Sequence, residues 1–62
     1  MHLLRRVEKF LREHDIPPTR FGREAARDPR LVLDMRRGRE PGARMTRRVE
    51  HFMNIYAGGQ PQ

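Results

Sequence analysis

The start of the chain carries an apolar stripe with a helical period. Its members recur at intervals of three and four, with mostly charged residues between them: Leu3, Leu4, Val7, Phe10, Leu11 and His14. This spacing is typical of an amphipathic helix that buries one face. The helix has to end before Ile16, because a residue that precedes a proline is driven out of the α region. We therefore predict a first helix over residues 2–14.

Two short helices are predicted next. A pair of prolines suits the first turn of a helix, where a missing N–H group costs nothing, and predicts a second helix over residues 18–26. Asp28 and Pro29 are a favoured N-cap and first helical residue, and Gly38 is a favoured residue just beyond a helix end. These signals predict a third helix over residues 29–37.

A fourth helix follows a loop. Proline and glycine make residues 39–42 the loop, and the stripe after it consists of Met45, Val49, Phe52, Met53 and Tyr56. This stripe predicts a helix over residues 43–57. We therefore expect an all-α, compact four-helix domain over residues 1–57, with residues 58–62 as a flexible tail.

The second and third helices carry the residue types that a helix-turn-helix requires. A small residue, Gly22, would let the third helix cross the second closely. The other required positions are a small residue at the turn, a cap, two apolar anchors and a closing glycine, filled by Ala26, Asp28, Val32, Met35 and Gly38. The sequence thus predicts a central helix-turn-helix.

The positive charge of the chain is concentrated in its middle. The net charge is +6, and residues 20–48 contain ten arginines against four acidic residues, so the whole excess lies in that segment. Such a segment attracts a polyanion by counterion release and long-range electrostatics. An arginine-rich solubilising surface would have the same composition, so charge alone does not choose between the two.

The residue types argue against several functional classes. The chain has no cysteine and no serine, and its three histidines are scattered, so we expect no metal site and no cofactor. Lacking these nucleophiles and paired carboxylates in a plausible cleft, it is expected to be neither an enzyme nor a binder of a small-molecule substrate. No apolar run suits a membrane span or a signal peptide, so we expect no membrane partner and a cytoplasmic location.

The spacing of the helix-turn-helix residues resembles the signature of the lambda-repressor-like regulators, also called the XRE family. The similarity covers about residues 18–40 and is carried by Phe21, Gly22, Ala26, Asp28, Val32, Met35 and Gly38. In the family pattern a glycine usually stands at Ala26, an apolar residue at Arg27 and often an acidic residue at Arg36. The resemblance implies a transcription regulator, associated with the nucleoid of a bacterium or phage, whose third helix enters the major groove of double-stranded DNA.

The same resemblance assigns roles to individual side chains. Arg30 is the best candidate for a fork onto guanine O6 and N7. Asp34 would either accept from cytosine N4 or pair with Arg30. Of Leu31 and Leu33, one would contact a thymine methyl group unless it packs in the core. The complete predicted DNA-binding set, phosphate contacts included, is Thr19, Arg20, Arg27, Arg30, Leu31, Asp34, Arg37, Arg39 and Arg44.

Two further hypotheses concern partners. The last helix has more apolar residues than one buried face requires. The surplus lies near its end, at Met53, Ile55 and Tyr56. They predict a homodimer through that helix. The alternative to DNA binding is a protein-interaction adaptor or an RNA-binding module that uses the same arginine-rich face. A DNA reader would hold Arg30, Asp34 and Arg37 free on the outside, whereas an adaptor would expose Leu33 among apolar neighbours.

Overall fold

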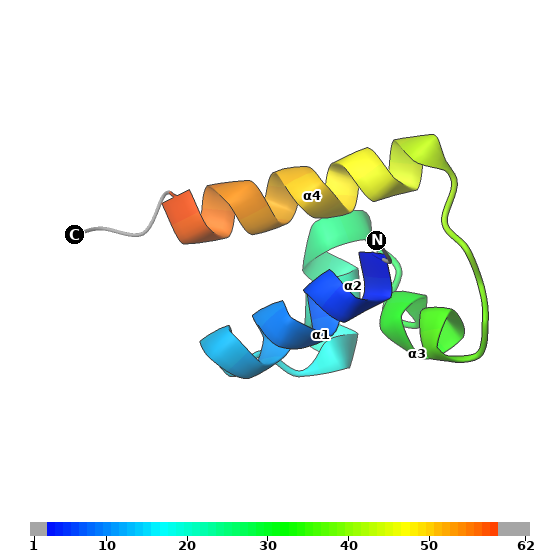
Figure 1. Cartoon of the computed structure of the whole chain (residues 1–62), viewed down its shortest axis with the longest axis horizontal. Helices are drawn as coiled ribbons and strands as arrows, with labels where there is room; N and C mark the ends of the chain where they lie inside the picture. The colour runs from blue at the N-terminus through cyan, green and yellow to red at the C-terminus, as the bar shows by residue number, and fades with distance from the viewer. Residues whose placement is uncertain (1–2, 59–62) are drawn as a thin grey trace.

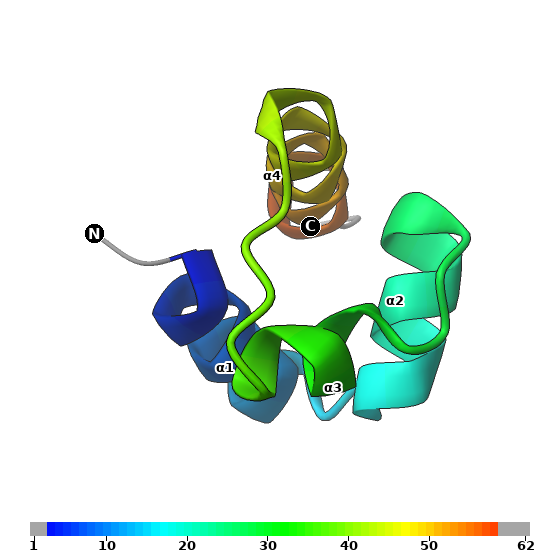
Figure 2. The ribbon, with the colours of Figure 1, turned by 90° about the vertical axis from the view of Figure 1, so that its right-hand side faces the viewer.

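A computed structural model describes residues 3–58, with the side chains of residues 3–56. Within this range the chain forms four helices and no strand: α1 (Leu3–His14), α2 (Pro18–Ala26), α3 (Leu31–Arg36) and α4 (Ala43–Gly58) (Figure 1). Seen from the end, α3 lies between α1 and α2, and α4 lies above them (Figure 2). The predicted all-α four-helix domain is confirmed. Of the predicted tail, Gly58 belongs to α4, and residues 59–62 lie outside the described residues.

Each of the first three helices is followed, within two residues, by a residue with a positive φ angle. These residues are Asp15, Arg27 and Gly38, with φ angles of 55°, 56° and 109°. The conformation reverses the chain, so that the next N–H groups reach the last free carbonyls of the helix. The Ile16 N–H group, for example, donates to the Leu11 carbonyl at 3.0 Å. Gly38 confirms the predicted closing glycine, whereas Asp15 and Arg27 carry a Cβ into a region that costs about 1–2 kcal/mol per residue.

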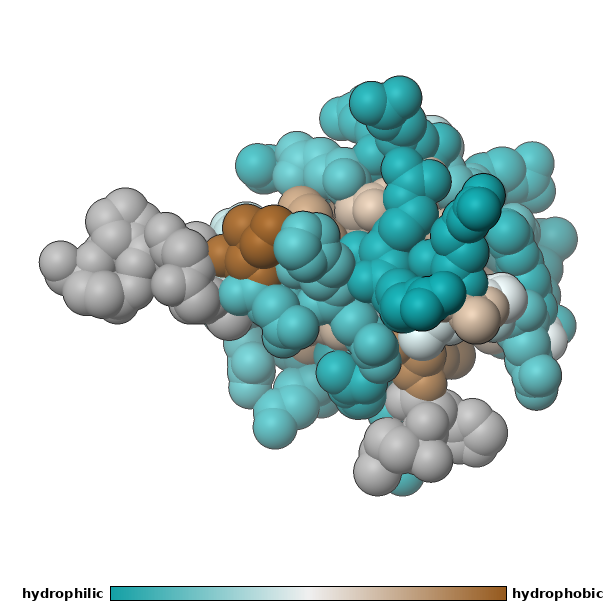
Figure 3. Space-filling view, turned by 90° about the horizontal axis from the view of Figure 1, so that it is seen from above, coloured by the Kyte–Doolittle hydropathy of each residue, from teal (hydrophilic) through white to brown (hydrophobic). Residues whose placement is uncertain are grey.

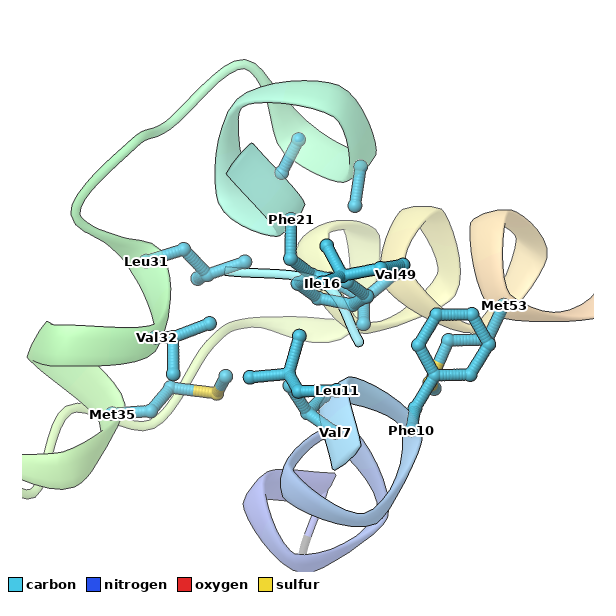
Figure 4. Packing of buried hydrophobic residues seen from close by; sticks show 12 residues of the cluster. Val7, Phe10, Leu11, Ile16, Phe21, Leu31, Val32, Met35, Val49 and Met53 are labelled. Carbon is cyan, nitrogen blue, oxygen red and sulfur yellow. The ribbon is translucent and has the colours of Figure 1, made fainter. Parts of the chain in front are cut away.

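One apolar core joins the four helices (Figure 4). Its largest fully buried side chains come from every helix: Val7, Phe21, Leu31, Val32 and Val49. The predicted anchors of the third helix, Val32 and Met35, are both buried. Burying an apolar side chain of this size contributes about 1.5–3 kcal/mol. The core therefore fixes the rotation of α3 about its own axis, and with it the direction of its outer side.

Aromatic rings connect α1 to α2 and α4. The ring of Phe10 lies 5.7 Å from that of Phe21 and 5.4 Å from that of Tyr56, both edge to face. His14 stacks on the same group, with ring centres 4.3 Å from Phe10 and 4.9 Å from Tyr56. Aromatic pairs at these separations are favourable beyond the area that they bury. His14 is therefore a structural part of this cluster.

The homodimer surface predicted on the last helix is largely used by the fold itself. Met53 is only 7% exposed and belongs to the core, and Tyr56 is partly buried against Phe10. Met53 is buried because it continues the inward stripe of α4 one turn beyond Val49, and the homodimer itself stays a prediction. Ile55, in contrast, is exposed.

Candidate nucleic-acid interface

The close packing of α2 against the turn before α3 depends on Gly22. The Asp28 N–H group donates to the Gly22 carbonyl at 3.0 Å, so the turn folds back onto the last part of α2. A Cβ atom on Gly22 would overlap the Asp28 carbonyl oxygen and come within 3.3 Å of the Leu31 Cβ. The two backbones therefore touch at a position where only glycine fits. This confirms the prediction of a close crossing at Gly22.

The turn between α2 and α3 differs from the predicted one. Asp28 Oδ1 accepts the Arg30 N–H group at 3.1 Å, and the Asp28 carbonyl accepts the Leu31 N–H group at 3.0 Å. Pro29 and Arg30 thus lie inside a turn, and α3 begins at Leu31 instead of residue 29. The prediction of Asp28 as the helix N-cap is wrong, because its carboxylate closes this turn, a common use of aspartate. The N-cap is Arg30.

The predicted turn residues on the α2 side are also shifted. Ala26 is the last residue of α2 and is buried, and the left-handed position of the turn falls on Arg27. The Arg27 N–H group donates to the Arg23 carbonyl at 3.0 Å, which closes α2. Because the chain reverses at Arg27, its side chain is exposed and needs no apolar surroundings. An arginine is therefore tolerated at this position.

The two sides of α3 have different compositions. Leu31, Val32 and Met35 point into the core (Figure 4). Arg30, Leu33 and Arg37 are exposed, and their spacing of three and four residues aligns them along the opposite side. We call these three residues the outer row. Arg30 and Arg37 form no ion pair with any residue between 3 and 58.

The predicted contact of Leu31 with DNA is wrong. Its side chain is 0% exposed, and it lies against the Gly22 region of α2. Leu33 is 44% exposed instead. With Val32 and Met35 turned inward, the helical period places Leu31 beside them and Leu33 on the opposite side of α3. Of the two leucines that the resemblance implied as possible contacts with a thymine methyl group, Leu33 is therefore the exposed one.

Asp34 and Arg39 belong to a cluster of three charged residues beside the outer row. Arg39 Nη1 donates to Asp28 Oδ2 at 3.0 Å and to Asp34 Oδ2 at 3.1 Å. The hydrogen bond to Asp28 is the main reason why the pKa of Arg39 is raised above its ordinary value. Asp34 thus pairs with Arg39 and not with Arg30. A phosphate contact by Arg39 would have to compete with both carboxylates.

The remaining predicted contacts lie around α3. Thr19 and Arg20 are exposed in the first turn of α2, where the Phe21 N–H group makes the first helical bond, to Pro17. Arg20 is held by Glu24, with Nε 3.0 Å from Oε2. Arg44 is exposed in the first turn of α4, which lies at the same end of the molecule as α3 and the connecting loop (Figure 1).

Most arginines of the basic segment have no carboxylate partner among the described residues. Three of the ten are paired, namely Arg20, Arg36 and Arg39. The other seven are Arg23, Arg27, Arg30, Arg37, Arg44, Arg47 and Arg48. Arg47 and Arg48 are exposed on α4, whose outer face is mostly hydrophilic (Figure 3). The predicted set omits them, and α4 lies on the far side of the core from α3 (Figure 2).

Three further features of the described residues concern other kinds of site: a groove, possible metal ligands and possible membrane spans. An open groove of about 520 Å³, with a largely apolar lining that includes Leu3, Leu4, Met35 and Pro41, lies where the start of α1 meets the loop before α4. Between residues 3 and 58, no group of three or more His, Cys, Asp or Glu side chains could hold a metal ion. No helix in the same range has the length and apolarity needed to cross a bilayer.

The features of the described residues that bear on function are the outer row, the charged cluster and the unpaired arginines. No family model matches the sequence, and no curated protein or solved structure is similar enough to indicate a relationship.

Proposed function

We propose that this chain binds double-stranded DNA, with α3 in the major groove, and acts as a small transcription regulator. The observation that carries the proposal is the outer row. Its two guanidinium groups, on Arg30 and Arg37, are exposed and have no carboxylate partner among the described residues. The opposite side of the same short helix is buried in the core.

The chemistry of the outer row suits the edges of base pairs. An arginine side chain is a planar fork that matches O6 and N7 of guanine, the commonest specific contact in the major groove. Such a contact needs a helix of fixed orientation, because a small rotation moves the fork to another base. The buried residues Leu31, Val32 and Met35 supply that orientation.

The charge beside α3 suits the phosphate backbone. Arg27, in the turn before α3, and Arg44, at the start of α4, are exposed and have no ion pair with other described residues. Each contact between such a group and a phosphate releases counterions, so affinity falls as salt rises. Phosphate contacts set the position of a protein on the duplex, and base contacts set its sequence preference. In the proposed complex the outer row contacts bases, and Arg27 and Arg44 contact phosphates.

The exposure of Leu33 bears on the adaptor hypothesis. An apolar docking surface would need apolar neighbours for this side chain. Its neighbours at three and four residues along the helix are Pro29, Arg30, Arg36 and Arg37. Three of these are cationic, so the surroundings of Leu33 suit a polyanion better than an apolar protein surface. The deep, narrow major groove of A-form RNA does not admit a helix, so duplex DNA is favoured over duplex RNA.

The proposal is tested by selecting sequences from a pool of random DNA duplexes with the purified chain, followed by gel shifts at several salt concentrations. We expect enrichment of a short guanine-containing site that outcompetes unrelated duplex DNA by at least about 1,000-fold. An RNA duplex of the same sequence serves as the comparison and should bind without sequence preference. If no sequence is enriched and the chain instead retains an acidic protein, the adaptor hypothesis replaces this one.

A further inference from the structure

Leu33 is an unusual feature of the outer row. It is one of two large apolar side chains that are exposed within the described residues, at 44%, and the other is Ile55. It lies between Arg30 and Arg37 on the side of α3 that faces away from the core. The fold does not need it there, because Leu31, Val32 and Met35 already fill the buried side of α3.

The major groove offers few groups that a leucine can contact favourably. The base edges present hydrogen-bond donors and acceptors, and the apolar group among them is the methyl group on C5 of thymine. A leucine against a donor or acceptor would displace water without replacing the lost hydrogen bond, which is costly. Against the methyl group it would remove apolar surface from water on both partners.

We propose that Leu33 recognises the C5-methyl group of a pyrimidine in the major groove, between the bases contacted by Arg30 and Arg37. The inference rests on the proposed function and adds to it the chemical identity of the central contact. Two bases carry this methyl group, thymine and 5-methylcytosine. A leucine side chain is short compared with an arginine, so the contact also requires that α3 lies deep in the groove.

The length of the outer row limits where this methyl group can be. The seven residue steps from Arg30 to Arg37, at the helical rise per residue, span about 10 Å. This corresponds to about three steps between base pairs. The bound sequence should therefore have the methylated pyrimidine inside a window of about three to five base pairs, bounded by the guanines that the two arginines contact.

The test removes one methyl group at a time from the DNA. Each thymine of the selected site is replaced in turn by deoxyuridine, which differs from thymine only by the missing C5-methyl group. Affinities are measured for the wild-type chain, for Leu33→Ala and for Ile55→Ala, the last as a control for loss of the other exposed apolar side chain. Circular dichroism and thermal melting of each variant verify that it folds.

For the wild-type chain we expect one thymine within the window whose replacement lowers affinity about fourfold, the effect of one buried methyl group. Leu33→Ala should bind the thymine and deoxyuridine sites equally, and Ile55→Ala should retain the fourfold difference. Equal sensitivity in the wild type and Leu33→Ala, or no sensitive thymine at all, would overturn the inference. If a sequence-specific, Arg30-dependent site persists in that case, the proposed function stands. If no DNA site is found, both fail.

Cytosine and 5-methylcytosine at the sensitive position separate the two sources of the methyl group. Tighter binding of the methylated base, lost in Leu33→Ala, would support recognition of the methyl group on either base. Equal binding of both would support thymine as the base that is read.

Discussion

Arg36 of α3 and Glu8 of α1 face each other and share two hydrogen bonds, Nε to Oε2 at 2.7 Å and Nη2 to Oε1 at 2.8 Å. Two parallel bonds of this kind are the strongest geometry for an arginine and a carboxylate. The pair joins helices that are 28 positions apart in the sequence.

This pair should make stability depend on pH. The hydrogen bond from Arg36 is the main reason why the pKa of Glu8 lies below its ordinary value of 4.5. A lowered pKa in the folded state means that the stabilisation is complete above about pH 5 and is lost as pH falls through the folded value. Glu8→Gln should therefore lower the melting temperature at pH 7 by a few degrees, the range expected for a partly exposed ion pair.

The thermal melting of wild type and Glu8→Gln should converge as the pH falls from 7 to 3. The control variant is Glu13→Gln, which removes the other carboxylate of α1 that has an ion-pair partner. Glu13 lies 3.9 Å from Lys9, and both side chains are mostly exposed. Its replacement should therefore have little effect on the melting temperature at either pH. A Glu8→Gln deficit that is the same at pH 3 and pH 7 would contradict the role of the charge.

Gly22→Ala should destabilise the fold. The added methyl group would overlap the Asp28 carbonyl oxygen, a backbone atom that cannot move without opening the turn. Forcing an extra methyl group into a packed site costs about 1–3 kcal/mol, which urea denaturation would measure. Gly42→Ala is the matched control, since a Cβ there meets no atom within 4 Å. Equal stability of the two variants would show that the backbones do not touch at Gly22.

Arg27→Gly should stabilise the fold. Arg27 has a φ angle of 56°, a region that glycine enters without steric cost. We expect a gain of about 0.5–1 kcal/mol in the free energy of unfolding. The same change four residues earlier, Arg23→Gly, lies inside α2 and should cost about 1 kcal/mol. The free energy of unfolding should therefore rise in Arg27→Gly and fall in Arg23→Gly. A loss of stability in both variants would refute the left-handed backbone at Arg27.

Arg30→Ala should weaken binding to the selected DNA site by about 1–3 kcal/mol, while binding to unrelated duplexes changes far less. Gel shifts or fluorescence anisotropy at constant salt would measure both. Arg12→Ala removes the same charge from the last turn of α1, which lies at the other end of the molecule from α3 (Figure 1). If both variants lose the same affinity on every sequence, Arg30 contributes only charge.

Helix positions and core residues followed from local patterns in the sequence. The stripes of α1 and α4 predict both helices because each buries one continuous face, and Val32 and Met35 predict the inward side of α3. Gly22 was predictable because a glycine inside a helix has few other uses. These signals depend on neighbours within one or two turns, which is the range over which a sequence pattern carries information.

The predictions that the structure corrects concern residues with more than one possible local partner, or residues whose partner is distant in the sequence. The carboxylate of Asp28 can cap a helix or close a turn, and both uses fit the same sequence. Arg39 binds Asp28, which is 11 positions away in the sequence, and it also binds Asp34. These hydrogen bonds leave neither Arg39 nor Asp34 free for another partner. The burial of Leu31 and the exposure of Leu33, in contrast, follow from the local pattern, because Val32 and Met35 fix the inward side of α3.

The separation between the two sides of α3 has an evolutionary consequence. Nothing in the outer row contributes to the core, and the contact at Gly22 sets the approach of α3 through backbone atoms. Replacing Arg30, Leu33 or Arg37 should therefore leave the folding of the domain intact. On the proposed function, single substitutions in the outer row would change the preferred DNA sequence without compensating changes elsewhere.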